Sequence, residues 1–452
     1  MIRRLIRSVV FGALLCCGVL PLASPPAPAQ SAVRWLFTSD LHFNPLDDPT
    51  LTAQLANAPI AQWDALFAAQ PHPLASYGSD SNAPLLHSAL ARMQEALPDP
   101  PVVFISGDVL PHRFREQWNA SASDRSDAAF YAFVDKTVAY LAREFDLTFP
   151  HAQFVITLGN NDSACGDDIV WPNSPYLAHF AQAWEPLVNR NGTAPAFVQD
   201  FSADGDYVTT VPGGTRIIAV NSNAWMTAEK NDCDPGGKAS SDVMAWFERA
   251  VAQAPSGAHT WALMHVPPGI DAYASLRRGA PVPFYHPELL ARFRSVHAAD
   301  GEPLGLIVAA HLHNDGFRIV DQTPLLLVPS ISPNHANNPA FFVATMNAAA
   351  STIADYTAYD LDLAAAGLHG TAPRWRLEYD FNSTYGLSTP GFSLATLGAL
   401  QAAIAADPAV RGTEADHYVS GALVQAITDR TWRAYWCANQ DLDPATYERC
   451  LR

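Results

Sequence analysis

Five short apolar runs in this chain each end at residues that can bind a metal ion. Runs of this length and composition predict buried strands. Ligands of open α/β sheets bind at the carboxyl ends of the strands, so the side chains that follow these runs are expected to converge. Asp, Asn and His gathered at one point suit a metal centre better than they suit a core. The runs and the residues after them are 33–39 with Asp40 and His42, 102–106 with Asp108, 154–158 with Asn160 to Asp162, 260–264 with His265, and 304–308 with His311 and His313.

The residue types also indicate which metal chemistry to expect. His311 and His313 are one residue apart, and in an extended segment this spacing places both side chains on one side. Two divalent ions roughly 3.5 to 4 Å apart can clamp the attacking and leaving oxygens of a phosphoryl transfer. Such a pair needs a bridging carboxylate, and imidazole, carboxylate and amide ligands suit zinc, iron or manganese. We therefore predict two divalent metal ions, with zinc as the first choice.

The N-terminal segment predicts a secretory signal peptide over residues 1–29. Arg3, Arg4 and Arg7 lie at the start of the segment, the apolar run spans 5–22, and Ala27-Pro28-Ala29 offers a cleavage site of small residues. A membrane anchor is the alternative, but the run is short and is interrupted by glycine and proline. We therefore expect a secreted or periplasmic protein with no stable membrane span.

The number of cysteines and the net charge indicate the compartment of the protein and the kind of ligand it can bind. Four cysteines lie outside the predicted leader, an even number that suits two disulfides in an oxidising compartment. Three connectivities are possible; closeness in the chain favours Cys437 with Cys450, which leaves Cys165 with Cys233. The formal net charge is −17 at pH 7, and this argues against a nucleic-acid-binding platform, which requires a basic patch.

Strand-like and helix-like segments alternate early in the chain, and strands accumulate later. This order predicts an α/β fold with a sheet-rich core flanked by helices. Residues 44–83 are expected to form a long loop, and 419–436 a helix. Because 452 residues exceed the usual size of one core, we predict a catalytic domain at 30–385 and a small C-terminal helical subdomain at 386–452. Further helices are expected at 84–97, 126–145, 175–188, 241–252, 287–297 and 394–405.

The ordered set of motifs resembles the calcineurin-like metallophosphoesterase superfamily. The motifs are Asp40-x-His42, Gly107-Asp108, Gly159-Asn160, His265 and His311-x-His313, within residues 33–345. Additional residues resemble its acid sphingomyelinase-like phosphodiesterase branch. They are Gly107-Asp108-Val109-Leu110-Pro111-His112, Met264-His265-Val266-Pro267-Pro268-Gly269 and Asn337-Asn338-Pro339. The resemblance implies a metallophosphoesterase-type β-sandwich flanked by helices.

The resemblance also implies a ligand set. Asp40, His42, Asp108 and His313 would surround the first metal, and Asp108, Asn160, His265 and His311 the second, with Asp108 as the bridge. Taken singly, Asp40 and Asn160 also suit ordinary turns, and His265 suits a buried structural histidine.

Two further positions are predicted to be catalytic. His112 is the candidate general acid, because histidine titrates near the useful pH; a surface or supporting histidine is the alternative. Asn161 replaces the family's histidine, and its amide can donate a hydrogen bond but not a proton. Aromatic residues between the motifs either line a substrate cleft or pack in the interior: Trp171, Tyr176, Trp225, Tyr273 and Tyr285.

Together these observations predict a secreted two-metal phosphodiesterase that hydrolyses a small-molecule phosphate ester by in-line attack of metal-bound hydroxide. Acid sphingomyelinase carries a saposin-like domain before its first metal motif, and few residues separate the predicted cleavage site from Asp40. Soluble nucleotide or head-group esters therefore rank above sphingomyelin. The alternatives are endopolyphosphatase-like activity, suggested by Gly159-Asn160-Asn161-Asp162, sphingomyelin phosphodiesterase activity, or a metal-binding protein with little catalysis. The oligomeric state is left open.

Overall fold

The structure is a computed structural model that describes residues 32–227, 239–298, 304–347, 349–365, 372–386 and 390–452. Val33 to Arg452 form one compact unit. The predicted signal peptide and Cys233 lie outside the described residues. Within the described residues, no helix is both long enough and apolar enough to span a bilayer.

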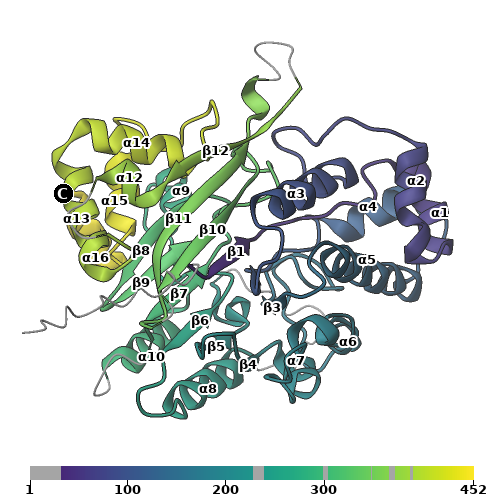
Figure 1. The fold of residues 1–452 in the computed structure, drawn as a ribbon, viewed down its shortest axis with the longest axis horizontal. Coiled ribbons are helices and arrows are strands. Elements are labelled where there is room, and N and C mark those ends of the chain that lie inside the picture. The colour runs from purple at the N-terminus through teal and green to yellow at the C-terminus, as the bar shows by residue number, and fades with distance from the viewer. Residues whose placement is uncertain (1–31, 228–238, 299–303, 348, 366–371, 387–389) are drawn as a thin grey trace, which may run out of the picture. The chain divides into compact units, whose positions relative to one another are not determined.

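Two six-stranded sheets form the centre of this unit, with helices around them (Figure 1). The first sheet has the order β12-β11-β10-β1-β2-β3, and the second has the order β4-β5-β6-β7-β9-β8. The strands of the first sheet are β1 (Arg34–Thr38), β2 (Val102–Ile105), β3 (Gln153–Ile156), β10 (Ala340–Asn347), β11 (Thr352–Leu361) and β12 (Trp375–Asp380). Those of the second are β4 (Tyr207–Thr210), β5 (Arg216–Ala219), β6 (Thr260–Leu263), β7 (Leu306–Ala309), β8 (Gly316–Val320) and β9 (Thr323–Leu327).

Parallel pairing in both sheets decides where the polar strand ends meet. β1, β2 and β3 are parallel, as are β5, β6, β7 and β9. All residues of β2, β3, β6 and β7 are buried, as expected for strands covered on both faces. The two sheets pack against each other through Trp35 of β1 and Trp261 of β6, whose ring centroids are 5.5 Å apart. The predicted α/β sandwich flanked by helices is confirmed.

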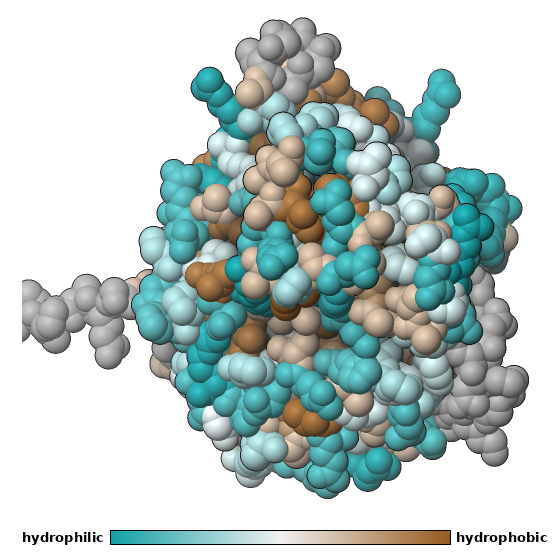
Figure 2. All heavy atoms as spheres, turned by 90° about the vertical axis from the view of Figure 1, so that its right-hand side faces the viewer, coloured by the Kyte–Doolittle hydropathy of each residue, from teal (hydrophilic) through white to brown (hydrophobic). Residues whose placement is uncertain are grey.

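Helices cover the outside of the sandwich. Those before β8 are α1 (Thr52–Asn57), α2 (Trp63–Ala69), α3 (Ala83–Ala96), α4 (Phe114–Ser121), α5 (Asp127–Thr148), α6 (Pro175–Val188), α7 (Phe197–Asp204), α8 (Ala239–Ala252), α9 (Ala272–Arg278) and α10 (Pro287–Ala298), with 3-10 turns η1 (Pro49–Leu51), η2 (Ile60–Gln62) and η3 (Ser222–Trp225). Those near the C-terminus are α12 (Phe381–Tyr385), α13 (Leu394–Ala406), α14 (Pro408–Tyr418), α15 (Trp432–Ala438) and α16 (Pro444–Leu451). The molecular face on the α1, α2 and α5 side mixes polar and apolar side chains (Figure 2).

Local sequence explains where the clearest helices begin. The Ser126 hydroxyl accepts a hydrogen bond from the Ala129 backbone N–H at the start of α5. Ser174 caps α6 in the same way, with Pro175 at the first helical position. Both arrangements satisfy backbone N–H groups that have no partner inside the helix. The six helices expected at 84–97, 126–145, 175–188, 241–252, 287–297 and 394–405 are therefore found within a few residues of their predicted bounds.

Two expectations about secondary structure are wrong. Residues 44–83 contain α1 and α2, whose short apolar faces did not show a helical period. The helix expected at 419–436 is interrupted, because Ser420 and Gly421 have positive φ angles of 52° and 69°. The chain therefore leaves α14 at Tyr418 and becomes helical again only at Trp432.

The C-terminal helices pack on the second sheet through α13, which contacts β8 and β9. Gln401 of α13 and Trp436 of α15 exchange side chain to backbone hydrogen bonds of 2.6 and 2.7 Å. The predicted disulfide between Cys437 and Cys450 is present. The pairing of Cys165 with Cys233 and the domain boundary at 385/386 stay predictions.

Candidate metal centre

The loops that follow five parallel strands meet at one edge of the sandwich. Asp40 and His42 follow β1, Asp108 follows β2, Asn160 follows β3, His265 follows β6, and His311 and His313 follow β7. Backbone hydrogen bonds join the first two loops, from Asp40 N–H to Gly107 O at 3.0 Å and from His42 N–H to Asp108 O at 2.9 Å. Across the two sheets, the His265 Nδ1 atom lies 2.8 Å from Ser106 O. The structure therefore brings together all seven residues predicted as metal ligands.

Most of these residues have a backbone conformation that L-residues rarely adopt. The φ angles of Asp40, His42, Asp108, His311 and His313 are 46°, 39°, 54°, 71° and 60°. Such left-handed residues cost free energy and concentrate at functional sites. The adjacent glycine is equally constrained: a Cβ at Gly107 would lie 2.6 Å from Gly159 N and 2.9 Å from His265 Nδ1. The loops are thus shaped to present side chains rather than to continue a sheet or helix.

One group of side chains contains Asp40, His42, Asp108 and His313, all buried. The Nε2 atoms of His42 and His313 are 3.0 Å apart. His42 Nε2 is 3.4 Å from Asp108 Oδ2, and His313 Nε2 is 3.5 Å from Asp40 Oδ1. His42 Nδ1 lies 3.0 Å from Leu110 O, so this nitrogen donates its proton to the backbone and Nε2 has a free lone pair.

A second group contains Asp108, Asn160, His265 and His311. His265 Nε2 lies 3.1 Å from Asp108 Oδ2 and 3.1 Å from Asn160 Oδ1. His311 Nδ1 lies 2.8 Å from the same Asn160 oxygen. The Asn160 amide nitrogen donates to Asp168 Oδ1 at 3.1 Å, which fixes the oxygen toward the histidines. Asp108 belongs to both groups, as a bridging carboxylate must.

The donor set fits divalent metal ions. Both carboxylate oxygens of Asp40 and Nδ1 of His313 are buried without a hydrogen-bond partner among the described residues. Unpaired buried polar atoms are costly unless a cation or water satisfies them. Facing imidazole nitrogens at 3.0 Å can share only one proton, whereas a cation accepts both lone pairs. The seven side chains therefore supply the imidazole, carboxylate and amide donors of a transition-metal site.

Burial controls the protonation of these groups. It lowers the pKa of His42 to about 3, with His112 adding to the effect, and it lowers the pKa of His311 to about 3, with His265 adding. Burial also raises the pKa of Asp40 to about 7. At His265 burial opposes the charged form, but the neighbouring Asp108 outweighs it and raises the pKa to about 9. His42 and His311 are thus held as neutral imidazoles, the form that binds metal ions.

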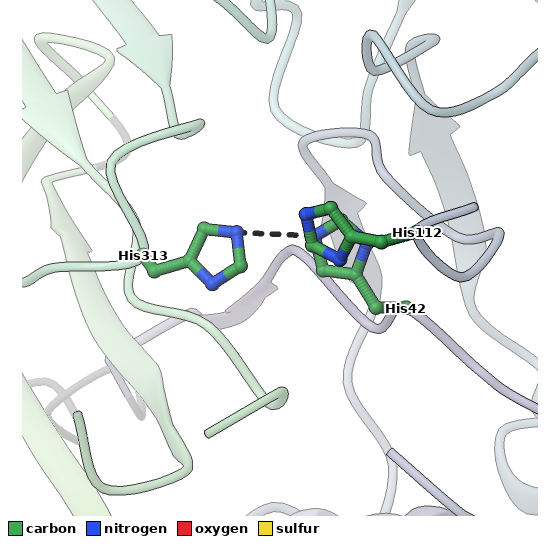
Figure 3. A group of neighbouring side chains, drawn as sticks. All are labelled: His42, His112 and His313. Atoms are coloured by element: carbon green, nitrogen blue, oxygen red, sulfur yellow. Dashed lines mark hydrogen bonds between the residues drawn. The ribbon is translucent and has the colours of Figure 1, made fainter. Parts of the chain in front are cut away.

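His112 lies against the first group of predicted ligands. Its ring stacks on that of His42 with centroids 4.0 Å apart, and His313 faces these two rings with its centroid 6.0 Å from that of His112 (Figure 3). His112, His42 and His313 each offer a ring nitrogen within 4.8 Å of the others. The His112 side chain is 27% exposed and borders the predicted metal ligands. Its role as the general acid stays a prediction.

Asn161 contacts the bridging carboxylate directly. Its backbone N–H donates to Asp108 Oδ1 at 2.8 Å and its side-chain Nδ2 donates to Asp108 Oδ2 at 2.8 Å. Asn161 is 3% exposed. The amide therefore orients Asp108 in this structure, and its catalytic role stays a prediction.

Three residues near the centre were not predicted as site residues. Asp80 accepts a hydrogen bond from the His112 ring, and Asp162 accepts from the backbone N–H groups of Val109, Leu110 and Gly159. His335 stacks on His313 with centroids 4.1 Å apart. Asp162 directly follows the Gly159-Asn160-Asn161 run, so its position was a usable signal. Asp80 and His335 lie in loops without periodicity, and only the fold brings them to the site.

The aromatic residues between the motifs divide between the two predicted roles. Trp171 and Tyr176 line a small pocket beside Asn160, with Ile169 and Val170. Trp225 and Tyr285 are fully buried in the interior. Tyr273 is 59% exposed.

Comparison with known families agrees with this geometry. The family model described as calcineurin-like phosphoesterase matches residues 33–315. The chain belongs to this family. As a calcineurin-like phosphoesterase it is a metal-dependent phosphoester hydrolase of a dinuclear class, and it acts on phosphate esters.

Named relatives of this calcineurin-like phosphoesterase lie in one branch. It is 26% identical over 409 residues to the acid sphingomyelinase-like phosphodiesterase 3b of Homo sapiens, covering 84% of this chain and 82% of that protein. It is 25% identical over 336 residues to the sphingomyelinase phosphodiesterase D of Dictyostelium discoideum, covering 68% of this chain and 66% of that protein. Among solved structures, a dimetal phosphatase from Danio rerio has a TM-score of 0.40 and 9% identity, covering 72% of this chain and 95% of that one.

Proposed function

We propose that this chain is an exported two-metal phosphodiesterase that hydrolyses soluble phosphodiesters of nucleotide or head-group type. The observation that carries the proposal is the pair of ligand groups that share Asp108 at the carboxyl ends of parallel strands. Relatives named as phosphodiesterases support the diester class. The arginines and apolar run before Ala27-Pro28-Ala29 support export.

We assign Asp40, His42, Asp108 and His313 to one ion and Asp108, Asn160, His265 and His311 to the other, with zinc as the first candidate and iron or manganese as alternatives. When bound, such ions supply an activated water and neutralise charge on the phosphoryl oxygens. The protein holds its ligands in place through outer hydrogen bonds. Leu110 O fixes the His42 ring, Ser106 O fixes the His265 ring, and Asn161 fixes both oxygens of Asp108.

His112 is the residue we assign to the leaving group. Diester cleavage expels an alkoxide or phenoxide, and a positioned imidazolium lowers the barrier by donating a proton to it. Burial opposes the charge on His112, but the hydrogen-bonded Asp80 outweighs it and raises the His112 pKa. Asp80 therefore favours the protonated form of His112, which is the form that can donate to the leaving oxygen.

The surroundings of the centre favour a small ester over a long polyanion. The pocket beside Asn160 has an apolar wall of Ile169, Val170 and Trp171 and polar side chains that include Asn221 and Asn223, a lining that suits a base or another flat group. Arg115, three residues after His112, already pairs with Asp127, and the whole chain carries a charge of −17, which disfavours a long polyanion. Polyphosphate and sphingomyelin remain the alternative substrates.

The test combines metal content with two model esters. The purified protein is analysed for bound metal, then assayed on bis(p-nitrophenyl) phosphate and on p-nitrophenyl phosphate across pH. Two ions per chain and faster hydrolysis of the diester are expected. A protein that prefers the monoester, or holds no metal, would overturn the proposal. Export is tested separately, by expressing the full chain and sequencing the N-terminus of the material found outside the cytoplasm.

A second candidate is a metal-binding protein with little catalysis. It is favoured by one observation, because the Asn161 amide is bonded to Asp108 and cannot donate a proton. The same assay separates the two candidates, since this protein would hold two ions and turn over neither ester.

A further inference from the structure

Asp80 holds His112 by two hydrogen bonds. The ring Nδ1–H of His112 donates to Asp80 Oδ1 at 2.8 Å, and the His112 backbone N–H donates to Asp80 Oδ2 at 2.9 Å. The Asp80 carboxylate thus accepts hydrogen bonds from both the main chain and the ring of His112, which lies 32 positions away in the sequence. The Asp80 side chain is only 6% exposed, so water competes little for these bonds.

Asp80 is itself fixed from two directions. The Asn334 side-chain amide donates to Asp80 Oδ1 at 2.9 Å. The next residue, Ser81, donates its backbone N–H to His42 O at 3.1 Å and so ties the loop to a predicted metal ligand. On the other side, the Gly78 backbone N–H donates to Pro333 O at 3.1 Å. The carboxylate therefore sits in a rigid frame and can set the orientation of the His112 ring.

These bonds decide which ring nitrogen of His112 is available. Because Nδ1 donates to Asp80, Nε2 is the nitrogen left to exchange a proton with a substrate. The ring lies parallel to that of His42, with an interplanar angle of 20°, and borders the cluster shown in Figure 3. A rotation of the ring would break the bond to Asp80 and the stack on His42 together.

We propose that Asp80 is a positioning residue that aims His112 Nε2 at the leaving oxygen of the substrate. The inference rests on the proposed function and deepens it. In the reaction, the oxygen of water bonds to phosphorus and the bond from phosphorus to the leaving oxygen breaks. The proton on His112 Nε2 passes to that oxygen, which keeps the electron pair of the broken bond. The attacking water loses a proton to solvent, His112 regains one from solvent after the alcohol leaves, and Nδ1–H stays bonded to Asp80 throughout.

The experiment compares two diesters that differ in the basicity of the leaving group. A p-nitrophenolate departs as an anion near neutral pH, whereas phenolate is more basic and depends more on a proton donor. We expect Asp80→Asn to lower kcat on diphenyl phosphate by about 10- to 100-fold, and kcat on bis(p-nitrophenyl) phosphate by less than about threefold. KM and the content of two ions are expected to stay unchanged on both esters.

A double variant shows whether Asp80 acts through His112. In a His112→Ala background, Asp80→Asn is expected to cause no further loss of kcat on diphenyl phosphate, because the group that Asp80 positions is absent.

Asp167→Asn is the matched control: Asp167 accepts the Arg113 backbone N–H at 3.1 and 3.0 Å but has no bond to the His112 ring. It should affect both esters alike. Asp80→Glu keeps the carboxylate and should lower kcat on diphenyl phosphate by less than Asp80→Asn does. It replaces Asp80→Asn in the test if that variant folds poorly.

Several results would overturn the inference. They are unchanged kinetics in Asp80→Asn, an equal loss on both esters, a loss of bound metal, or a further loss in the His112→Ala background. A wild-type protein that holds two ions but cleaves neither ester overturns the proposed function instead, and the role of Asp80 falls with it.

Discussion

Two groups of histidine and carboxylate side chains in this molecule have nearly the same composition and different surroundings. The strand-end centre contains Asp40, His42, Asp108 and His313, and a helical cluster between α2, α3 and α5 contains Asp64, His87 and Glu144. Each brings its donor atoms within 4.8 Å of one another. Residue types alone would therefore predict a metal site in both places.

The difference lies in charge compensation, burial and backbone. Arg143 pairs with Asp64 and with Glu144, and the Tyr140 hydroxyl donates to Asp64 at 2.7 Å. The side chains of His87 and Asp64 are 38% and 40% exposed, and all members of the cluster lie on regular helices. Among the described residues, the basic groups within 4.0 Å of the Asp40 and Asp108 carboxylates are histidines, with no arginine or lysine. The predicted metal site is thus marked by buried carboxylates that contact histidines rather than arginine, held on left-handed backbone.

Loss of the bridging carboxylate is expected to have the largest effect on metal content and activity, and it tests the difference between the two groups most directly. Asp108→Asn is expected to lose both ions together and to lower activity by more than the roughly 10- to 100-fold typical of an outer ligand partner. Elemental analysis and the diester assay measure it. Asp64→Asn is the control, with ion content unchanged. Retention of two ions in Asp108→Asn would show that Asp108 does not bridge.

His112→Ala separates binding from catalysis within the strand-end centre. We expect kcat to fall by about 10²- to 10⁴-fold, because the leaving group loses its proton donor. Two ions should remain, because the assigned ligands are intact. The matched control is His335→Ala, which removes the neighbouring imidazole and should reduce kcat less. If His112→Ala loses an ion, His112 is a ligand and not the acid.

Removal of the metal ions should expose the pH dependence of the empty ligand set. The pKa of His265 is about 9 in the fold, above its ordinary value of 6.5, because the neighbouring Asp108 carboxylate outweighs the effect of burial. A raised pKa stabilises the fold below the unfolded value and loses this effect as pH rises through the folded value. EDTA-treated protein should therefore lose stability, on the order of 2 kcal/mol, between pH 6.5 and 9.

Chemical denaturation at several pH values measures this change. Added zinc or manganese should abolish the loss of stability, because the metal-bound ligands are deprotonated at both ends of this pH range. A metal-free protein whose stability is constant or rises over this range would contradict the assignment of His265 as a charged partner of Asp108.

The smallest effect is expected in the helical cluster. His87→Ala should change the free energy of unfolding by only about 0–1 kcal/mol, as for other partly exposed ion pairs, and leave the ion content at two. Thermal unfolding and elemental analysis test both statements. A third ion in the wild type that disappears in His87→Ala would mean that Arg143 does not exclude a metal.

The strand ends could be predicted because sequence encodes them locally. An apolar run followed by Asp, Asn or His marks both a buried strand and the residue at its carboxyl end, and parallel pairing places these ends together. The convergence of the seven predicted ligands and the sandwich follow from this rule. The disulfide between Cys437 and Cys450 follows from their closeness in the chain.

Other parts of the site depend on contacts that no local pattern encodes. Asp80 reaches His112 only because its loop is bonded to the His42 loop, and His335 reaches His313 because a separate loop crosses the edge of the sandwich. The left-handed conformation of five ligands is also invisible in sequence, because Asp and His show no strong preference for it as glycine does. Ala310, which directly precedes His311, lies outside the left-handed region, so its side chain carries no such conformational cost.

The two ligand groups each draw side chains from both sheets, and this has a consequence for biosynthesis. His42 and His313 are 271 positions apart, so the ribosome completes most of the chain before both rings exist. A nascent chain that ends before His265 has Asp40, His42, Asp108 and Asn160 but neither full ligand group. Metal loading is therefore one of the last events in the making of this protein, and for an exported chain the ions would come from the compartment in which it folds.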